Sequence, residues 1–341
     1  MTEHFSTLSG WMIPFSRAME ARDIDLSEAM LACNIDQKAL KDQESRIAAE
    51  CFTTLIDYCN QKLNKHDFAL SVAEHFHPGT FHVLGYAMMS SNTLKDALTR
   101  VAQYKRVVSN TCELSVKEKD TDLIFEMQIF SYQDTDRLVL SRDSVLAFLG
   151  TIIKFSRALV GQDFKAKKLF FCYPKPDFDT QFINDFFGCD IEFNAPHSGL
   201  VLDKHKANEA LIGANPLITQ THEKLLNEFL SRINKDDLIQ QVRTKIYDFL
   251  PLGTPSQSDI ASELGLSLRN LQRKLNEKGS SFKDILEDTR KRLAIDYLKQ
   301  SHLSLGEVSY LVGFSNLSNF NRAFKRWTEL TPGEFRQQHL N

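Results

Sequence analysis

Several features are missing from this 341-residue sequence, and each absence excludes a class of protein. No stretch approaches the run of about 18 apolar residues that a membrane-spanning helix needs. The first residues also lack a basic leader followed by an apolar segment, so we expect a cytoplasmic protein without a membrane contact. The 42% hydrophobic and 25% charged content is ordinary for a globular chain, and the length favours two domains.

Motifs for catalysis and metal binding are missing as well. The chain contains no G-x-S-x-G, G-x-x-x-x-G-K-S/T, G-x-G-x-x-G or H-E-x-x-H sequence. Its six cysteines show no C-x-x-C spacing, which indicates reduced thiols rather than disulfides or zinc ligands. His75 and His77 would not share one helical face, so they do not form a metal site. We expect no enzymatic activity, no metal and no cofactor.

The net charge of −3 hides an uneven distribution. Residues 1–234 hold 25 Lys and Arg against 31 Asp and Glu, whereas residues 235–341 hold 16 against 13. Between residues 267 and 326 the counts are 12 basic and 6 acidic. Positive charge therefore gathers in the C-terminal part, as expected for a surface that meets phosphates.

Two stretches of this basic part, 258–276 and 305–326, share one pattern: a short apolar helix, a glycine, a serine and a second, basic helix. The glycine and the expected capping serine are Gly265 and Ser267 in the first stretch, and Gly313 and Ser315 in the second. A glycine permits a sharp reversal, and a serine can cap the helix that follows. Each stretch therefore predicts a helix-turn-helix.

Between the two stretches, residues 282–300 predict a connecting helix about 28 Å long. One turn of duplex DNA spans about 34 Å. A connector of this length could hold both recognition helices on one face of the DNA, each in a major groove.

The exposed faces of the two recognition helices supply the candidate DNA contacts. Amide side chains can pair with adenine edges, and Arg and Lys can bind guanine edges or phosphates. The candidates are Ser267, Arg269, Asn270, Gln272, Arg273 and Lys274 on the first helix, and Asn316, Ser318, Asn319, Arg322, Lys325 and Arg326 on the second. Lys274, Lys325 and Arg326 fit phosphate contacts best. The opposing interpretation is an ordinary solvated polar face, and the aromatic residues Phe320 and Phe324 are expected to be core.

Over about the last hundred residues the sequence resembles the AraC/XylS-type bacterial transcription regulators. The matching residues are Ile260, Ala261, Leu264, Gly265, Ser267, Arg273, Arg290, Ala294, Gly313, Phe314, Phe320, Phe324, Lys325, Pro332, Phe335 and Arg336. One position differs, since Glu329 stands where the family usually has a glycine after the last recognition helix. A left-handed backbone conformation would be strained at a glutamate.

The N-terminal part predicts an α+β domain. Its first ninety residues suggest helices, including 14–33 and 43–63, and residues 112–119 and 122–130 alternate like two paired strands. A long helix is expected at 136–160. Gly85, Tyr86, Ser91, Thr93, Leu94, Ala97, Leu98 and Tyr104 resemble the sensor domain of a subgroup of ornithine- or arginine-responsive and virulence regulators. The resemblance implies an effector pocket, and amino acids, sugars, aromatic acids and fatty acids all remain open as effectors.

We therefore expect an α+β effector-binding or dimerisation domain at 1–234, followed by an all-α DNA-binding domain at 235–341. The expected function is a transcription regulator, more often an activator in this family, whose partners are promoter DNA, RNA polymerase, a small effector and a second copy of the chain. An architectural DNA-binding protein whose first domain only dimerises is the alternative. A DNA-repair methyltransferase regulator is disfavoured because the cysteines are too dispersed.

Overall fold

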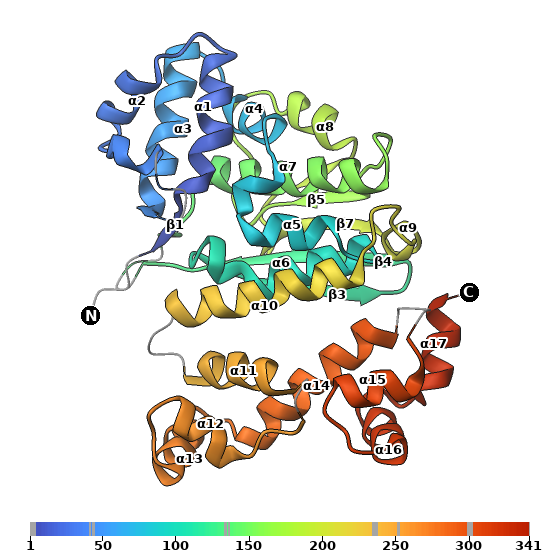
Figure 1. Cartoon of the computed structure of the whole chain (residues 1–341). Helices are drawn as coiled ribbons and strands as arrows, with labels where there is room; N and C mark the ends of the chain where they lie inside the picture. The colour runs from blue at the N-terminus through green and yellow to red at the C-terminus, as the bar shows by residue number, and fades with distance from the viewer. Residues whose placement is uncertain are drawn as a thin grey trace. The chain divides into compact units, whose positions relative to one another are not determined.

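The computed structural model describes residues 5–40, 42, 45–132, 135, 137–233, 238–250, 253–298 and 303–340. Contacts divide the chain into two compact units, Met1–Asn215 and Pro216–Asn341 (Figure 1). The boundary expected between residues 234 and 235 lies outside the described residues. Helix α10 (Pro216–Ile233) belongs to the C-terminal unit, because Thr244 of the next helix donates a hydrogen bond to the Asn227 carbonyl oxygen at 3.1 Å.

The N-terminal unit contains one main sheet whose strand order is β3-β4-β7-β5-β6. Its strands are β3 (Cys112–Lys119), β4 (Asp122–Ile129), β5 (Lys168–Phe170), β6 (Ile191–Glu192) and β7 (Ser198–Asp203). All neighbouring pairs are antiparallel except β5 and β6. The predicted hairpin at 112–119 and 122–130 is confirmed, with Lys119 opposite Asp122 at its turn.

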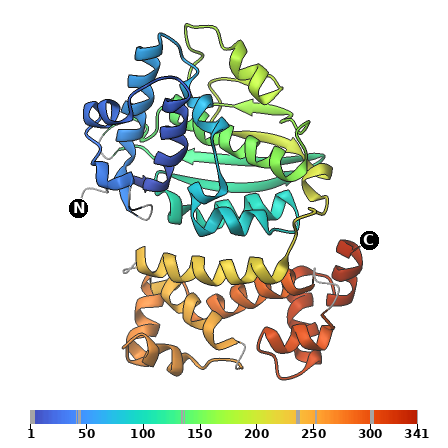
Figure 2. The same cartoon turned by 45° about the horizontal axis from the view of Figure 1, so that its top comes forward.

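Helices surround this sheet. They are α1 (Met12–Glu20), α2 (Leu26–Ala32), α3 (Ala49–Leu63), α4 (Phe68–Glu74), α5 (Val83–Met89), α6 (Leu94–Val108), α7 (Arg142–Val160), α8 (Gln181–Phe187) and α9 (Lys204–Asn208), with 3-10 turns η1 (Ser9–Trp11), η2 (Gln37–Leu40) and η3 (Pro78–Phe81). Helix α7 lies across one face of the sheet (Figure 2), where Phe148 packs on Phe125 of β4 with ring centroids 6.3 Å apart. A Cβ at Gly150 would come within 2.8 Å of the Ala73 Cβ, so this glycine permits the close crossing of α7 and α4.

The start of the chain differs from the predicted layer of uninterrupted helices. The helix expected at 14–33 is two helices, because Asp23 has a left-handed backbone (φ 54°) and Asp25 caps α2 by accepting from the Glu28 N–H. The helix expected at 43–63 begins only at Ala49. It is preceded by β2 (Arg46–Ala48), which pairs antiparallel with β1 (Ser6–Leu8). The long helix expected at 136–160 begins at Arg142, where Ser141 supplies the cap.

The C-terminal unit is helical throughout its described residues, as predicted. After α10 its helices are α11 (Leu238–Phe249), α12 (Gln257–Glu263), α13 (Leu268–Glu277), α14 (Phe282–Leu298), α15 (Leu305–Leu311), α16 (Leu317–Thr328) and α17 (Pro332–Leu340). Helices α12–α13 and α15–α16 are the two predicted helix-turn-helix units, and α14 connects them. One core joins the unit, and it includes Val242, Ile260, Leu293 and Phe320. Among the described helices of the chain, none has the length and apolar character to span a membrane.

Candidate DNA-binding surface and interior cavity

The first recognition helix, α13, is fixed by its cap and its apolar face. The Ser267 hydroxyl caps the helix by accepting a hydrogen bond from the Asn270 backbone N–H at 3.3 Å, as predicted. Leu271 and Leu275 are fully buried. On the opposite side the Asn270 side-chain oxygen accepts from the Arg273 guanidinium at 3.0 Å. The helix therefore presents an amide and a guanidinium as one joined pair.

The second recognition helix, α16, repeats this arrangement with a different cap. We predicted Ser315 as the cap, but that prediction is wrong: Asn316 caps the helix, and its side-chain oxygen accepts from the Asn319 N–H at 2.8 Å. The turn after Gly313 contains one residue more than the turn after Gly265, which moves the cap along the chain. The Asn319 side-chain oxygen in turn accepts from Arg322 at 2.6 Å. Each recognition helix thus carries a capping residue, an Asn and an Arg at the same spacing.

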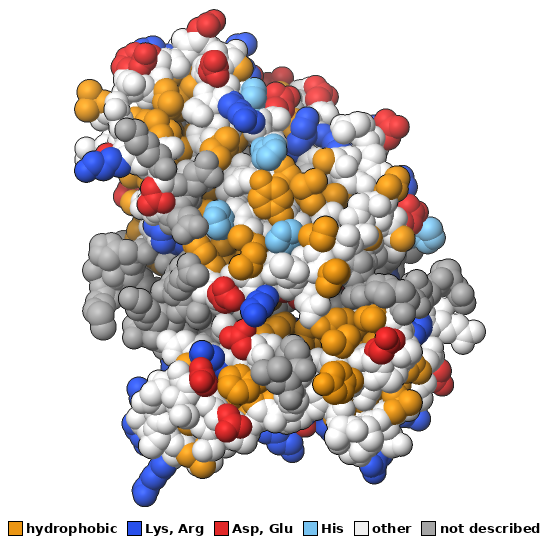
Figure 3. All heavy atoms as spheres, viewed as in Figure 1, with side chains coloured by type: hydrophobic (Ala, Val, Ile, Leu, Met, Phe, Trp, Pro, Cys, Tyr) orange, Lys and Arg blue, Asp and Glu red, His pale blue; other side chains and the backbone are white. Residues whose placement is uncertain are grey.

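Almost all predicted contact residues lie on the outside of these two helices. The exposed residues are Ser267, Arg269, Gln272, Arg273, Lys274, Asn316, Ser318, Asn319, Arg322, Lys325 and Arg326, and Asn270 is half-buried. Helices α13 and α16 lie at the same edge of the C-terminal unit, which is lowest in both ribbon views (Figures 1 and 2). Lys and Arg side chains project from this edge (Figure 3). The structure therefore brings the candidates of both helices to one edge.

Some of the candidate side chains also contact other protein groups. The Gln272 amide donates to the Gln257 side chain of α12 at 3.1 Å. Arg326 forms an ion pair with Glu287 of α14 at 3.0 Å. Arg273 forms one with Glu277, four residues further along the helix. A contact from these three side chains to DNA would have to replace or share the protein contact.

The basic run at 290–292 has an internal role at two of its positions. Arg290 donates to the carbonyl oxygens of Val312 and Gly313 at 3.0 and 2.8 Å, and its guanidinium lies 4.5 Å from the centroid of the Phe314 ring. Burial lowers the pKa of Arg290 from its usual value. Arg292 pairs with Asp288 of the same helix. Arg290 therefore attaches the turn of the second unit to the connecting helix.

The turn after α16 contains the residue that departs from the family pattern. Glu329 is the C-cap of α16 and adopts a left-handed conformation with φ 66° and ψ −5°. A side chain with a Cβ is strained in this region, whereas glycine is not. The backbone at this position therefore has the left-handed conformation that glycine adopts without strain, and Glu329 adopts it with strain.

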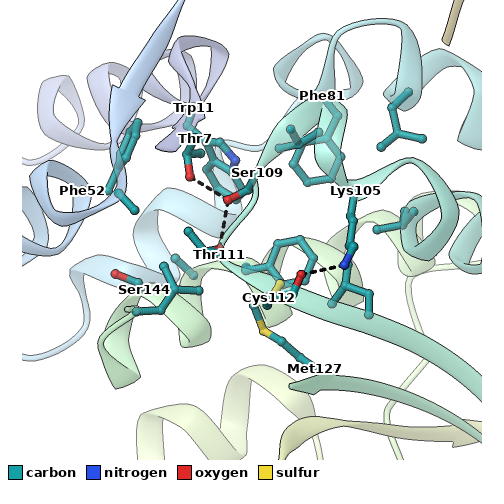
Figure 4. Close-up of a pocket in the computed structure, with 18 of the residues that line it drawn as sticks. Thr7, Trp11, Phe52, Phe81, Lys105, Ser109, Thr111, Cys112, Met127 and Ser144 are labelled. Carbon is teal, nitrogen blue, oxygen red and sulfur yellow. Dashed lines mark hydrogen bonds between the residues drawn. The ribbon is translucent and has the colours of Figure 1, made fainter. Parts of the chain in front are cut away.

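The N-terminal unit contains a mainly apolar cavity of about 80 Å³ (Figure 4). Its aromatic lining consists of Trp11, Phe15, Phe52, Phe81 and Phe148. These residues come from η1, α1, α3, η3 and α7, and the Trp11 and Phe81 rings lie 5.5 Å apart. The cavity therefore lies where the helical layer meets the sheet.

The polar groups of the lining are few. They are Thr7, Lys105, Ser109, Thr111 and Ser144. Cys112 also lines the cavity, and burial raises the pKa of its thiol to about 12 against the opposing effect of the Lys105 ammonium. The thiol is therefore neutral at pH 7. No Asp or Glu is among the described residues that line the cavity.

Comparison with known proteins assigns the chain to a family. Residues 24–211 match the model of the arabinose-binding domain of AraC transcription regulators, and residues 260–338 match a helix-turn-helix domain model. The chain belongs to the AraC family of transcription regulators. Its C-terminal unit contains the helix-turn-helix domain at 260–338, and the protein is a DNA-binding transcription regulator.

Two curated regulators match most of the chain. The ornithine utilization regulator of Pseudomonas aeruginosa is 27% identical over 90% of this chain and 89% of its own length. VirS, an HTH-type transcriptional regulator of Mycobacterium tuberculosis, is 24% identical over 84% of this chain and 83% of its own length. These relatives confirm the predicted resemblance to the ornithine-responsive and virulence subgroup. Among solved structures, the transcriptional regulator CdpR of P. aeruginosa covers 95% of this chain and 96% of its own at 18% identity, with a TM-score of 0.47.

The sequence did not reveal which residues of this AraC-family protein line the cavity. They come from elements far apart in the chain, as Thr7 and Lys105 illustrate, and no local pattern joins them. The one usable signal was the abundance of phenylalanine, 25 residues, which is also typical of an ordinary core. For metals, no group of three or more His, Cys, Asp or Glu side chains among the described residues could hold an ion.

Proposed function

We propose that this regulator reads promoter DNA with both recognition helices and that a small effector in the N-terminal cavity changes how strongly it binds. The observation that carries the proposal is the repeated cap, Asn and Arg arrangement on α13 and α16. The Arg–Asn hydrogen bond orients a planar guanidinium, which suits bidentate contact to the O6 and N7 atoms of guanine. Two such pairs on one unit fit two successive major-groove segments.

The remaining candidates fit supporting roles. Arg269, Gln272 and Ser318 are exposed beside the two pairs and are proposed to contact base edges with them. Lys274, Lys325 and Arg326 are proposed to bind phosphates, which would position the protein without reading sequence. Helix α14 has 17 residues and is about 26 Å long, so it suits a spacing between recognition helices close to one turn of DNA.

Effector control is supported by the mainly apolar cavity, because such cavities with a few polar groups are the usual sites of small ligands. Ornithine is one candidate effector by the name of a relative. We further propose activation through RNA polymerase recruitment, with the protein acting as a homodimer. Effector binding would shift the population between a form with high and a form with low promoter affinity.

The DNA proposal is tested with the full chain and the DNA upstream of its own gene. Binding is measured against a scrambled duplex at two salt concentrations, for the wild type and for Arg269→Ala combined with Arg322→Ala. We expect the double variant to lose affinity mainly for the true site, by about 10- to 100-fold, because base contacts discriminate sequence. Arg137→Ala, which changes an exposed arginine of the N-terminal unit, is the control. Equal, salt-sensitive binding to both duplexes would contradict sequence reading and favour the architectural alternative.

Effector control is tested by filling the cavity. Ala147 on α7 is buried and lines the cavity, whereas Ala158 on the same helix is exposed. We expect Ala147→Phe to change promoter affinity and reporter transcription, and Ala158→Phe to change neither. An unchanged promoter affinity in Ala147→Phe, with the fold intact, would contradict control through the cavity.

A further inference from the structure

Lys105 is the one charged side chain among the described residues that line the cavity. It lies in the last turn of α6, and its side chain is only 10% exposed. Taking an ammonium group out of water is costly unless it has partners, so a lysine at this depth needs an explanation. Its surroundings suggest which ligand the cavity takes.

The hydrogen-bond and ion-pair partners of Lys105 lie on the neighbouring strand β3, and its Nζ also lies 5.9 Å from the centroid of the Phe130 ring. Its Nζ donates to the Cys112 carbonyl oxygen at 2.9 Å (Figure 4) and forms an ion pair with the Glu113 carboxylate. An ammonium group has three N–H donors, and these contacts account for two of them. Glu113 is 58% exposed, so its carboxylate reaches Lys105 from the solvent side and can return to water at little cost.

Three hydroxyl groups belong to the polar part of the same lining. Ser109 follows Lys105 by one helical turn, and its backbone N–H donates to the Lys105 carbonyl oxygen at 2.7 Å. The Ser109 hydroxyl is hydrogen-bonded to the hydroxyls of Thr7 and Thr111, both at 2.9 Å (Figure 4). The cavity therefore offers an ammonium and several hydroxyl groups in a lining that is otherwise mostly aromatic and aliphatic.

Resting on the proposed function of the cavity as the effector site, we propose that it binds a small monocarboxylic acid with a short apolar body. The ligand carboxylate pairs with Lys105 from the cavity side, in competition with the Glu113 carboxylate, and accepts a hydrogen bond from one hydroxyl of the Ser109–Thr111 pair. The apolar body lies among Trp11, Phe81 and Phe148.

The lining disfavours the other effector classes. A cationic or zwitterionic ligand would place an ammonium in a cavity whose described lining has no carboxylate. A sugar would need more polar partners than a lining of five polar side chains and a neutral thiol provides. A cavity of about 150 Å³ takes benzene, so a cavity of 80 Å³ best fits an apolar body of roughly three to five carbon atoms.

The test uses the full chain with Trp327→Phe, because the chain has two tryptophans and Trp11 then reports on the cavity alone. Trp11 fluorescence and thermal stability are followed during titration with isobutyrate, isobutyramide and octanoate. We expect saturable binding of isobutyrate. Isobutyramide lacks the charge and octanoate exceeds the cavity, so each should bind at least about tenfold more weakly.

Variants of the ion pair sharpen the test. Lys105→Met should abolish the preference for the acid over the amide, and Lys105→Arg, which keeps the charge, should preserve it. Glu113→Gln should bind isobutyrate several-fold more tightly, because no protein carboxylate then competes for Lys105. Lys95→Met is the matched control, since Lys95 also lies on α6 and pairs with a β3 carboxylate, Glu118, but does not line the cavity. It should leave isobutyrate binding unchanged.

Equal binding of the amide and the acid, tight binding of octanoate, or weaker acid binding in Glu113→Gln would overturn the proposed ligand class. Promoter binding separates this result from the proposed function. If isobutyrate binds as expected but leaves promoter affinity unchanged, the ligand class stands and effector control fails. If no acid binds while Ala147→Phe still changes promoter affinity, effector control stands and the carboxylate class is wrong.

Discussion

The two helix-turn-helix units share the arrangement of their recognition helices and differ in how their turns are supported. Gly265, in the turn of the first unit, has φ 65°, and a Cβ added there would meet nothing within 4 Å. Gly313, in the turn of the second unit, has φ 76°, and a Cβ there would lie 2.8 Å from the Leu250 side chain and 3.3 Å from Arg290. The first turn is open, whereas the second is packed into the core of the unit.

This difference shows that one binding motif can be positioned in two ways. The Gly313 carbonyl oxygen accepts hydrogen bonds from Arg290 at 2.8 Å and from Thr254 at 2.5 Å, so three segments meet at the second turn. The first unit positions its recognition helix through the apolar contacts of Leu271 and Leu275. We infer that the orientation of α16 depends on α14 and that the orientation of α13 depends mainly on its own buried face.

The largest expected difference is in stability. Gly313→Ala should lower the free energy of unfolding of the C-terminal unit by about 3 kcal/mol, because a left-handed alanine is strained and its Cβ also overpacks Leu250. Gly265→Ala should cost about 1 kcal/mol, from strain alone. Urea unfolding with Trp327 as the reporter, in a Trp11→Phe background, measures both. If the two variants lose the same free energy of unfolding, the packing around Gly313 does not add to the cost of the substitution.

The next difference concerns DNA affinity at the two Asn–Arg pairs. Arg273 forms an ion pair with Glu277 in addition to its hydrogen bond to Asn270. Arg322 donates a hydrogen bond to Asn319. Arg322→Ala should therefore weaken binding to the true site by about 2 kcal/mol, and Arg273→Ala by about 1 kcal/mol. Titration with labelled promoter DNA measures these losses.

A third variant sharpens this comparison. In a Glu277→Gln background Arg273 no longer has a charged competitor, and the loss caused by Arg273→Ala should rise to that of Arg322→Ala. If Arg273→Ala and Arg322→Ala already lose the same DNA affinity when Glu277 is present, the Glu277 carboxylate does not weaken the contact of Arg273 with DNA.

The sequence predicted the two recognition helices well because their signals are local. A glycine, a cap and an apolar stripe lie within about one dozen residues, and the connecting helix at 282–300 was predicted from its own residues in the same way. The predicted cap of α16 was wrong because Ser and Asn are both good capping residues, and Ser315 and Asn316 are adjacent. Contacts outside the local pattern accompany the longer turn, because Phe314 packs on Phe320 and Trp327 and lies under Arg290.

Two other features could not be predicted for the same physical reason. Strands β1 and β2 have three residues each, too few to show alternation, and they form because they pair with each other across 37 intervening residues. The cavity is lined by Thr7, Phe52, Lys105 and Phe148, which no sequence spacing connects. In both cases the feature exists only after tertiary contacts form.

The caps provide a smaller test of the same comparison. Asn316→Ala and Ser267→Ala should each lower the free energy of unfolding by about 1 kcal/mol, because each leaves a backbone N–H without its side-chain acceptor. Ser315→Ala should change it by less than about 0.5 kcal/mol, as for other surface positions. Urea unfolding in the Trp11→Phe background gives all three values. If Ser315→Ala lowers the free energy of unfolding more than Asn316→Ala does, Ser315 rather than Asn316 caps the helix.

The smallest expected effect is at the turn that ends the second unit. Glu329→Gly should raise the free energy of unfolding by about 0.5 kcal/mol, because relief of left-handed strain of about 1–2 kcal/mol is partly offset by the greater freedom of glycine in the unfolded chain. Glu329→Ala keeps the Cβ and removes the charge, so it should leave stability nearly unchanged. The same urea measurement distinguishes them. If alanine stabilises as much as glycine, the cause is the carboxylate rather than the backbone conformation.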